Sequence, residues 1–269
     1  MRCFMKLGIS TSCYYGDKEV EDVVSLYNDN GITCAEVFLN CMSEYKPEFI
    51  SELKKRKGAL KIHSIHAHGT SFEPELFCPH QRSREDAEEV FRSVCRAAFE
   101  LNAKYITFHG PFVKKDRELD LDYGWFSARV NQLCEIAASY GLYIAYENVN
   151  WAFGSKPEFF TELLSYCPDL KATLDIKQAL FSGIDPLRFA DAMKDRLVTI
   201  HVCDMDKSLK QPLLPFKGRY NFERFFKEIK HNANIDPAVF IEVYRNNFTE
   251  FDELKDCYEK LSSLIESIK

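Results

Sequence analysis

Short runs of β-branched and aromatic residues alternate along the chain with longer stretches in which apolar residues recur at helical spacing. Eight of the short runs have the length and composition of strands: residues 6–11, 33–39, 61–69, 105–110, 142–149, 170–176, 197–203 and 239–244. The longer stretches predict amphipathic helices, among them residues 19–31, 83–102, 126–141, 222–232 and 251–269. Strands that alternate with helices indicate βαβ units and a parallel sheet. Eight such units in 269 residues predict an α/β chain that folds as one (β/α)8 TIM barrel domain over residues 1–269.

The connections between these elements differ in length. The turns from a helix to the next strand are short, as at Gly31-Ile32 and Gly141. The connections from a strand to the next helix are longer, at residues 69–81, 110–124, 150–157 and 204–221. In barrels of this kind the strand-to-helix loops build the active site. We therefore expect the functional site at the carboxyl ends of the strands.

Polar residues recur on one face of the predicted strands, because side chains two residues apart share a face. In the last four strands the aliphatic face should pack on the helices. This leaves four ionisable side chains that point into the barrel near its top: Glu147, Asp175, His201 and Glu242. The first four strands offer Ser10, Glu36, His66 with His68, and His109 in the same direction.

Three carboxylates gathered around one imidazole point to a bound cation. Crowded carboxylates repel one another and some become protonated unless positive charge lies among them. Carboxylate and imidazole ligands suit one divalent metal ion, with manganese, magnesium or cobalt favoured over the more thiolate-seeking zinc. A single inward ionisable residue is equally well explained as a hydrogen-bonded core residue; four at matching height favour the metal site.

Composition and charge narrow the functional classes. With 46% hydrophobic and 28% charged residues, the chain is globular rather than disordered. A net charge of −6 disfavours nucleic acid as a partner. The first ten residues lack the apolar core of a signal peptide, and no stretch approaches the roughly 18 apolar residues of a membrane span. The ten cysteines form no Cys-x-x-Cys pair, so we expect reduced thiols, a cytoplasmic protein and no membrane partner.

The inward residues stand in strings that resemble a known family. The strings are ENVN at Glu147, LDIKQA around Asp175, HVCD at His201, IEVY around Glu242, SIHAHG around His66, FHGPF around His109 and LLPFKGRYNF from Leu213. Each string is weak alone. In this order and spacing they resemble the xylose isomerase-like TIM barrel superfamily of sugar isomerases and epimerases, near the ketose 3-epimerases and hydroxypyruvate isomerases, over essentially the whole chain.

The resemblance implies roles for these residues. It implies one divalent metal bound by Glu147, Asp175, His201 and Glu242, with Glu147 and Glu242 also acting as acid/base catalysts. The residues expected to contact a small sugar or keto-sugar substrate are His66, His109, Lys177, Gln178 and Lys217. A metal on a carbonyl and its neighbouring hydroxyl stabilises an enediolate, while carboxylates on opposite sides of that plane remove and return a proton.

The chain also departs from the family pattern. Many relatives carry a histidine three residues after the aspartate, where this chain has Gln178, preceded by Lys177. The endonuclease IV branch needs that histidine and a further aspartate and histidine where this chain has Gln211-Pro212. An endonuclease IV-like nuclease is therefore disfavoured, and His66 and His109 are expected to face substrate or water, or to be satisfied polar residues inside the barrel.

Two other readings stay open beside the isomerase or epimerase. One is a metal-dependent lyase, such as a dehydratase of a keto-inositol, because an enediolate can also expel a β-hydroxyl group. The other is a catalytically silent sugar-binding barrel, against which the two glutamates argue, since binding alone needs no base. Substrate identity and phosphorylation, the metal that is loaded, and the oligomeric state stay open, with a homo-oligomer among the expectations.

Overall fold

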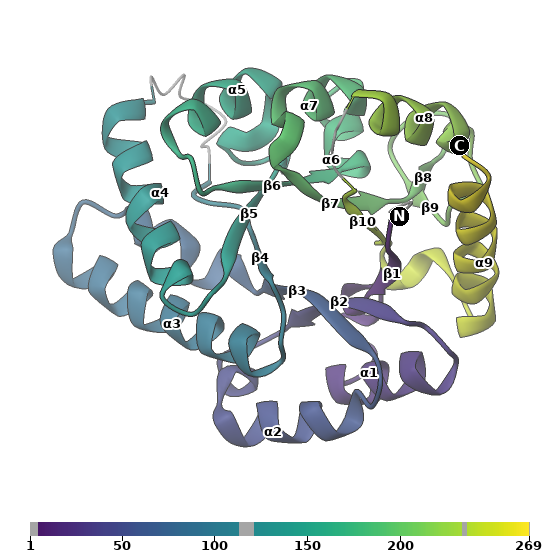
Figure 1. Ribbon diagram of the computed structural model, residues 1–269, viewed down its shortest axis with the longest axis horizontal. Coiled ribbons are helices and arrows are strands. Elements are labelled where there is room, and N and C mark those ends of the chain that lie inside the picture. The colour runs from purple at the N-terminus through teal and green to yellow at the C-terminus, as the bar shows by residue number, and fades with distance from the viewer. Residues whose placement is uncertain (1–4, 113–120, 233–235, 269) are drawn as a thin grey trace.

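The computed structural model describes residues 5–112, 121–232 and 236–268, and in them eight parallel strands close into a barrel (Figure 1). The strands are β1 (Leu7–Ser10), β2 (Cys34–Leu39), β3 (Lys61–Ala67), β4 (Tyr105–Phe108), β5 (Tyr143–Glu147), β6 (Lys171–Asp175), β7 (Leu197–Val202) and β10 (Ala238–Ile241). Their order around the barrel is β1-β10-β7-β6-β5-β4-β3-β2. The predicted single-domain (β/α)8 barrel is confirmed, with a strand in each of the eight predicted runs.

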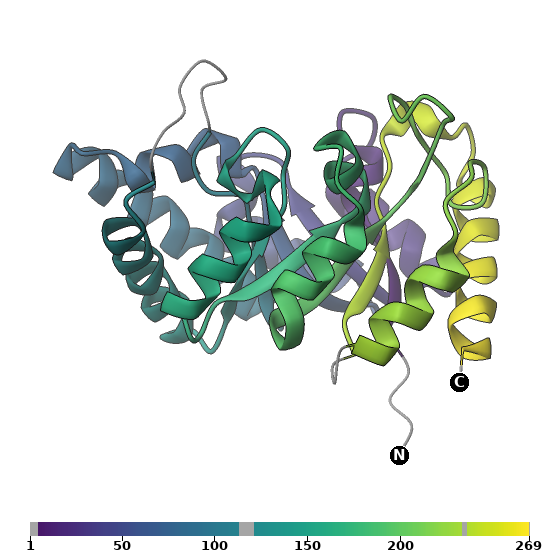
Figure 2. The same ribbon diagram turned by 90° about the horizontal axis from the view of Figure 1, so that it is seen from above.

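Helices surround the ring of strands (Figure 1). They are α1 (Val20–Asp29), α2 (Pro47–Arg56), α3 (Gln81–Glu100), α4 (Tyr123–Ala138), α5 (Pro157–Tyr166), α6 (Ile176–Phe181), α7 (Pro186–Met193), α8 (Phe222–Asn232) and α9 (Phe251–Ser267). The C-terminal helix α9, yellow in Figures 1 and 2, packs beside β1 and completes the outer layer. Among the described helices, none is long and apolar enough to cross a membrane.

Short elements occupy the loops between strands and helices. The 3-10 turns are η1 (Thr11–Tyr14), η2 (Met42–Tyr45), η3 (Gly69–Ser71), η4 (Glu73–Phe77), η5 (Phe153–Ser155), η6 (Lys194–Arg196) and η7 (Arg245–Asn247). A small antiparallel pair, β8 (Asp204–Met205) and β9 (Pro212–Leu213), lies in the loop after β7. Most of these turns lie in strand-to-helix connections, as the unequal loop lengths predicted.

Local sequence explains where several helices begin. The Asp122 carboxylate accepts a hydrogen bond from the Trp125 N–H and caps α4, and Asp175 accepts from the Gln178 N–H and caps α6. Along α3 the buried residues Ala87, Phe91, Val94 and Ala98 recur at intervals of three or four and face the barrel. Helical periodicity therefore fixes which face of α3 packs on the strands.

His63, Tyr105 and Phe240 form a cluster of rings inside the barrel, nearer the amino ends of the strands. The Phe240 ring occupies the space that a side chain on Gly8 would need, since a Cβ at Gly8 would lie 2.5 Å from that ring. The ring centroid of His63 lies 5.3 Å from that of Phe240 and 4.8 Å from that of Tyr105. Its Nε2 lies 3.1 Å from the hydroxyl oxygen of Thr199, on the far side of the ring of strands.

His63 is also the extra residue of a β-bulge. Ala35 of β2 pairs with Ile62 of β3, and the next residue, Glu36, pairs with Ser64. His63 therefore has no paired residue on β2. After the bulge, Ser64 directs its hydroxyl at Glu36 inside the barrel, and His66 also faces the interior. The bulge thereby sets the direction of the polar side chains in the upper half of β3.

The aromatic surroundings of His63 predict a pH dependence of stability. Burial lowers the pKa of His63 from its ordinary 6.5 to about 4, despite the attraction of the Glu36 carboxylate. As the pH falls, His63 therefore becomes protonated near pH 6.5 in the unfolded chain but only near pH 4 in the folded chain. We expect up to about 3 kcal/mol of unfolding free energy to be lost over this window, at roughly 1.36 kcal/mol per pKa unit.

Urea unfolding of the wild type and of His63→Gln between pH 4 and pH 7.5 measures this contribution. Other titrating groups affect both proteins equally, so the difference between the two unfolding free energies isolates His63. As the pH falls, we expect the free energy of unfolding of the wild type to decrease more than that of His63→Gln. A difference that is constant across the pH range would contradict the assignment.

Candidate active site

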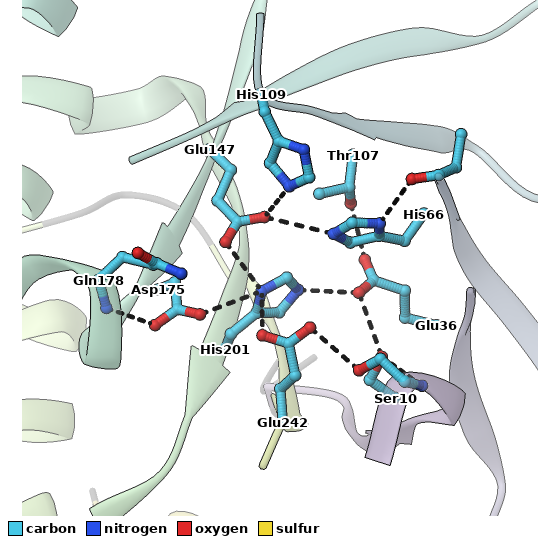
Figure 3. Close-up of polar contacts among 12 residues, drawn as sticks. Ser10, Glu36, His66, Thr107, His109, Glu147, Asp175, Gln178, His201 and Glu242 are labelled. Carbon is cyan, nitrogen blue, oxygen red and sulfur yellow. Dashed lines mark hydrogen bonds and ion pairs between the residues drawn. The ribbon is translucent and has the colours of Figure 1, made fainter. Parts of the chain in front are cut away.

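Four ionisable side chains converge at the carboxyl ends of the strands (Figure 3). Glu147 and Asp175 are the last residues of β5 and β6, His201 lies near the end of β7, and Glu242 directly follows β10. Parallel pairing sets their height, because Asp175 lies directly beside His201. One ligand atom from each residue lies within 4.8 Å of the others, and all four residues are buried. The structure thus brings together the four residues that the sequence predicts as metal ligands.

The His201 ring is the centre of this cluster. Its Nδ1 lies 3.3 Å from Glu242 Oε2, 3.7 Å from Glu147 Oε1 and 3.9 Å from Asp175 Oδ2. Figure 3 shows Glu147 and Glu242 approaching this nitrogen from two sides of the ring. The geometry places one imidazole nitrogen among three carboxylates, which is a ligand set for a divalent ion.

Glu36 determines how His201 presents that nitrogen. The Glu36 carboxylate is fully buried and accepts hydrogen bonds from the Ser64 and Thr107 hydroxyls, each at 2.7 Å. Its Oε1 lies 2.9 Å from His201 Nε2. Burial is the largest influence and acts to raise the pKa of Glu36, but the charge and hydrogen bonding of His201, together with the charge of His66, lower that pKa below its usual value. An ionised Glu36 holds the proton of His201 on Nε2, which leaves Nδ1 to face the cluster.

Several polar atoms of the cluster have no hydrogen-bond partner among the described residues. Asp175 Oδ2, Glu147 Oε2 and His201 Nδ1 are all buried and unpaired in this sense. More than nine in ten buried polar groups in proteins find such a partner. Asp175 Oδ2 and His201 Nδ1 face each other across the cluster, whereas Glu147 Oε2 faces His66 and His109 and Glu147 Oε1 faces His201. Buried oxygen and imidazole atoms without a partner fit a bound cation, so the residues present suit the metal that their types predict.

The protonation equilibria of the cluster show the same need for positive charge. Burial and the neighbouring Glu242 and Glu147 carboxylates raise the pKa of Asp175 to about 7, against the opposing effect of Lys177. Burial acts to lower the pKa of His201, but the carboxylates of Glu242, Glu36 and Glu147 raise it well above its ordinary value. Without a metal ion, Asp175 and His201 therefore hold protons more tightly than usual and offset part of the negative charge of the cluster.

Two more histidines extend the cluster on one side of Glu147. His66 Nε2 lies 3.6 Å and His109 Nε2 lies 3.4 Å from Glu147 Oε2. His66 Nδ1 lies 3.0 Å from the Ala67 carbonyl oxygen, which fixes its ring (Figure 3). Burial opposes the protonation of His66, yet the Glu147 and Glu36 carboxylates raise its pKa to about 9. His109 also packs edge-on against Trp151, with ring centroids 5.3 Å apart, next to the loop after β5.

Of the other three predicted substrate-binding residues, Lys177 lies in the cluster, Gln178 contacts a neighbouring loop and Lys217 is exposed. Lys177 is buried, and its Nζ lies 3.1 Å from Asp175 Oδ2 and 3.2 Å from Glu242 Oε2. The Gln178 side-chain oxygen accepts a hydrogen bond from the Asn150 N–H and links α6 to the loop after β5. Lys217 is exposed in the loop between β9 and α8. His68, expected inside the barrel beside His66, packs against the rings of Tyr15 and Phe38, and Phe38 also packs against His66.

Glu73 supports the site from a loop position that the sequence pattern does not single out. It is 1% exposed, and its Oε2 accepts hydrogen bonds from the N–H groups of His109 and Gly110, both at 2.9 Å. The same oxygen lies 3.8 Å from His109 Nδ1. Glu73 therefore fastens η4, in the loop after β3, to the end of β4 and holds His109 in place.

Comparison with known proteins identifies relatives over nearly the full chain. The model of a family described as xylose isomerase-like TIM barrel matches residues 24–264. The uncharacterised protein MJ1614 of Methanocaldococcus jannaschii is 24% identical, and the match covers 97% of this chain and all of that protein.

Solved structures with the same fold include two enzymes. One is D-psicose 3-epimerase of Clostridium cellulolyticum H10, crystallised with D-tagatose, with a TM-score of 0.79, 14% identity and coverage of 98% and 99% of the two chains. The other is AsbF of Bacillus anthracis, a probable 3-DHS dehydratase, with a TM-score of 0.76, 17% identity and coverage of 96% and 99%. At these identities the likeness establishes the fold.

The contacts of Glu73 predict a loss of stability when its carboxylate is removed. Glu73→Ala leaves two buried N–H groups without their acceptor, which we expect to lower the free energy of unfolding by about 2–4 kcal/mol. Glu75→Ala is the matched control, because Glu75 is an exposed glutamate in the same turn, and its removal should change stability by no more than about 0.5 kcal/mol. Urea unfolding measures both, and equal stabilities of the two variants would contradict the role of Glu73.

Proposed function

The chain belongs to the xylose isomerase-like TIM barrel family, and from this membership we propose that it is a divalent-metal-dependent isomerase or epimerase of a small sugar or keto-sugar in the cytoplasm. The observation that carries the proposal is the pair of buried glutamates, Glu147 and Glu242, on two sides of His201 Nδ1 (Figure 3). A pair of bases around one cation site suits a reaction in which a proton leaves one face of a carbon and returns at another position.

The proposed metal ligands are Glu147, Asp175, His201 and Glu242. Their support is that one ligand atom from each of the four buried residues lies within 4.8 Å of the others, that Asp175 Oδ2 and His201 Nδ1 have no hydrogen-bond partner among the described residues, and that the donor set is oxygen and imidazole nitrogen. Because no thiolate belongs to this group, we favour manganese, magnesium or cobalt over zinc. When bound, such an ion supplies positive charge that polarises a substrate carbonyl and stabilises the charge of an enediolate.

The protein supplies the proton transfers. One glutamate carboxylate takes the proton from the carbon next to the substrate carbonyl, and the electron pair of that C–H bond forms the enediolate. A proton then returns to the substrate, either from the opposite glutamate or from the first glutamate, which now carries the proton it removed. This proton adds to the same carbon from the other face, or to the adjacent carbon. Return to the same carbon is epimerisation, and return to the adjacent carbon is isomerisation.

Residues around this centre are suited to hold a polyhydroxylated substrate. We assign His66, His109, Lys177, Gln178 and Lys217 to substrate binding. His66 and His109 present ring nitrogens beside Glu147, and Trp151 offers an aromatic face next to His109. Aromatic faces pack well on the apolar side of a sugar ring.

A metal-dependent dehydratase is the second candidate function. It is favoured by the structural likeness to AsbF, a probable 3-DHS dehydratase, which covers 96% of this chain, against 98% for the epimerase. Both reactions begin with the same proton removal, so the product distinguishes them. A product lighter by one water indicates a dehydratase, and an isomer of equal mass indicates an epimerase or isomerase.

Metal binding is the first test of this proposal. We expect about one manganese, cobalt or magnesium ion per chain after dialysis, and a melting temperature that rises with metal concentration. At a metal concentration of 100 times the Kd, the added stability is about 2.7 kcal/mol.

The matched pair of variants for metal binding is Asp175→Asn and Asp191→Asn. Asp191 is an exposed carboxylate on α7, so its variant should bind metal like the wild type. Asp175→Asn removes one ligand charge and should weaken binding at least about 10-fold. Full activity in excess chelator, or no stoichiometric metal under any loading, would contradict the site.

The roles of the glutamates are tested by hydrogen exchange. Glu147→Gln and Glu242→Gln keep the shape of the side chain and remove the base, so each should slow solvent deuterium incorporation at the substrate carbon by about 10²–10⁴-fold. Proton NMR in D2O follows this exchange with a panel of ketoses that includes D-tagatose. Glu158 is an exposed glutamate on α5, so the Glu158→Gln variant should incorporate deuterium into the substrate at the wild-type rate. Wild-type exchange in either active-site variant would leave that residue as a ligand only, and sugar binding without any exchange would favour the silent barrel.

A further inference from the structure

Lys177 places a cation inside the cluster that is proposed to hold the metal. It is the second residue of α6 and is 4% exposed. Because Asp175 caps that helix directly after β6, Lys177 lies in the first helical turn beside a residue of the cluster. A buried ammonium needs anionic partners, and Lys177 has two, at 3.1 Å from Asp175 Oδ2 and 3.2 Å from Glu242 Oε2.

The ammonium uses the same oxygen atoms that the metal would need. The other carboxylate oxygens are already held by the protein: Asp175 Oδ1 accepts from the Gln178 N–H at 2.9 Å, and Glu242 Oε1 accepts from the Ser12 hydroxyl at 3.1 Å. The remaining oxygens, Asp175 Oδ2 and Glu242 Oε2, are those that face His201 Nδ1. The lysine and a divalent ion therefore compete for one pair of atoms.

We infer that Lys177 is a tethered counter-cation, which holds Asp175 and Glu242 together in the metal-free protein and is displaced when a divalent metal binds. This inference rests on the proposed metal centre and adds a role for a residue of this chain in metal affinity. Two cations cannot approach the same carboxylate oxygens without strong repulsion. Metal binding must therefore break the hydrogen bond from Lys177 to Glu242 Oε2 and the ion pair of Lys177 with Asp175 Oδ2 before these carboxylates can ligate.

The structure offers the displaced ammonium a place at the barrel mouth. Lys177 Nζ already lies 5.1 Å from the ring centroid of Tyr244, and the Tyr244 side chain is half exposed. A lysine cation over an aromatic ring is stabilised by the ring electrons. A small rotation of the lysine side chain toward Tyr244 would free the two oxygens and keep the positive charge beside the incoming substrate.

Calorimetry with MnCl2 alone tests this inference with three proteins: the wild type, Lys177→Met and Lys171→Met. Methionine keeps most of the side-chain length and removes the charge. Lys171 is the first residue of β6, at the opposite end of that strand from Asp175, so Lys171→Met removes an equal charge outside the cluster. We expect Lys177→Met to bind Mn²⁺ at least about 10-fold more tightly than the wild type, and Lys171→Met to bind like the wild type.

The metal-free proteins give an independent readout. Without Lys177, two buried carboxylates face each other with less compensating charge, so metal-free Lys177→Met should melt at a lower temperature and gain more from Mn²⁺ than the wild type does. If the metal-free variant does not fold, crystal structures of the wild type with and without Mn²⁺ replace it. They should show Lys177 Nζ leaving both carboxylate oxygens when the metal is present.

The outcomes separate this inference from the proposed function. Metal binding by the wild type and Lys177→Met with equal affinity, weaker binding by the variant, or an unmoved ammonium in the Mn²⁺ structure would overturn the tethered counter-cation. No Mn²⁺ binding by any of the three proteins would overturn the metal centre itself.

Discussion

Four carboxylates share the interior of this barrel at the carboxyl ends of its strands, and each lies between 2.9 and 3.9 Å from a nitrogen of His201. Two like charges about 4 Å apart repel by about 4 kcal/mol even at an effective dielectric constant of 20. Such a cluster is stable only when hydrogen bonds and positive charge offset the repulsion. Charge compensation is therefore the constraint on which the arrangement of the site depends.

Glu36, Asp175 and Glu242 meet this constraint in different ways. Glu36 receives hydroxyl hydrogen bonds and the Nε2 side of His201, so it is satisfied within the protein. Asp175 and Glu242 each have one oxygen held by the protein and one that faces the centre beside Lys177. Buried charge destabilises a fold unless it is paired. Buried carboxylates at this position are therefore better explained by a functional role than by a contribution to stability.

The barrel and its main cluster could be predicted from the sequence because both follow from local periodicity. Alternation along each strand separates the aliphatic outer face from the inward polar residues, and the parallel order brings the strand ends together. The bulge at His63 could not be predicted, because it appears only when β2 and β3 pair.

The supporting residues were harder to predict because their partners are distant in sequence. Glu73 lies in a loop with no periodicity, and its hydrogen bonds to His109 and Gly110 depend on how that loop folds over β4. The sequence predicts that Glu36 faces inward, but its partner His201 lies more than half of the chain away. The sequence predicts that Lys177 faces a substrate, and only the three-dimensional structure places its ammonium beside two carboxylates of the cluster.

The most direct test of this account is anomalous diffraction at the manganese edge from crystals of the wild-type protein soaked in MnCl2. The account predicts one strong peak per chain, within about 2.0–2.4 Å of oxygen or nitrogen atoms of Glu147, Asp175, His201 and Glu242. A peak at another place, or no peak while Lys177 still bridges Asp175 and Glu242, would contradict the claim that these buried carboxylates are arranged to hold a metal.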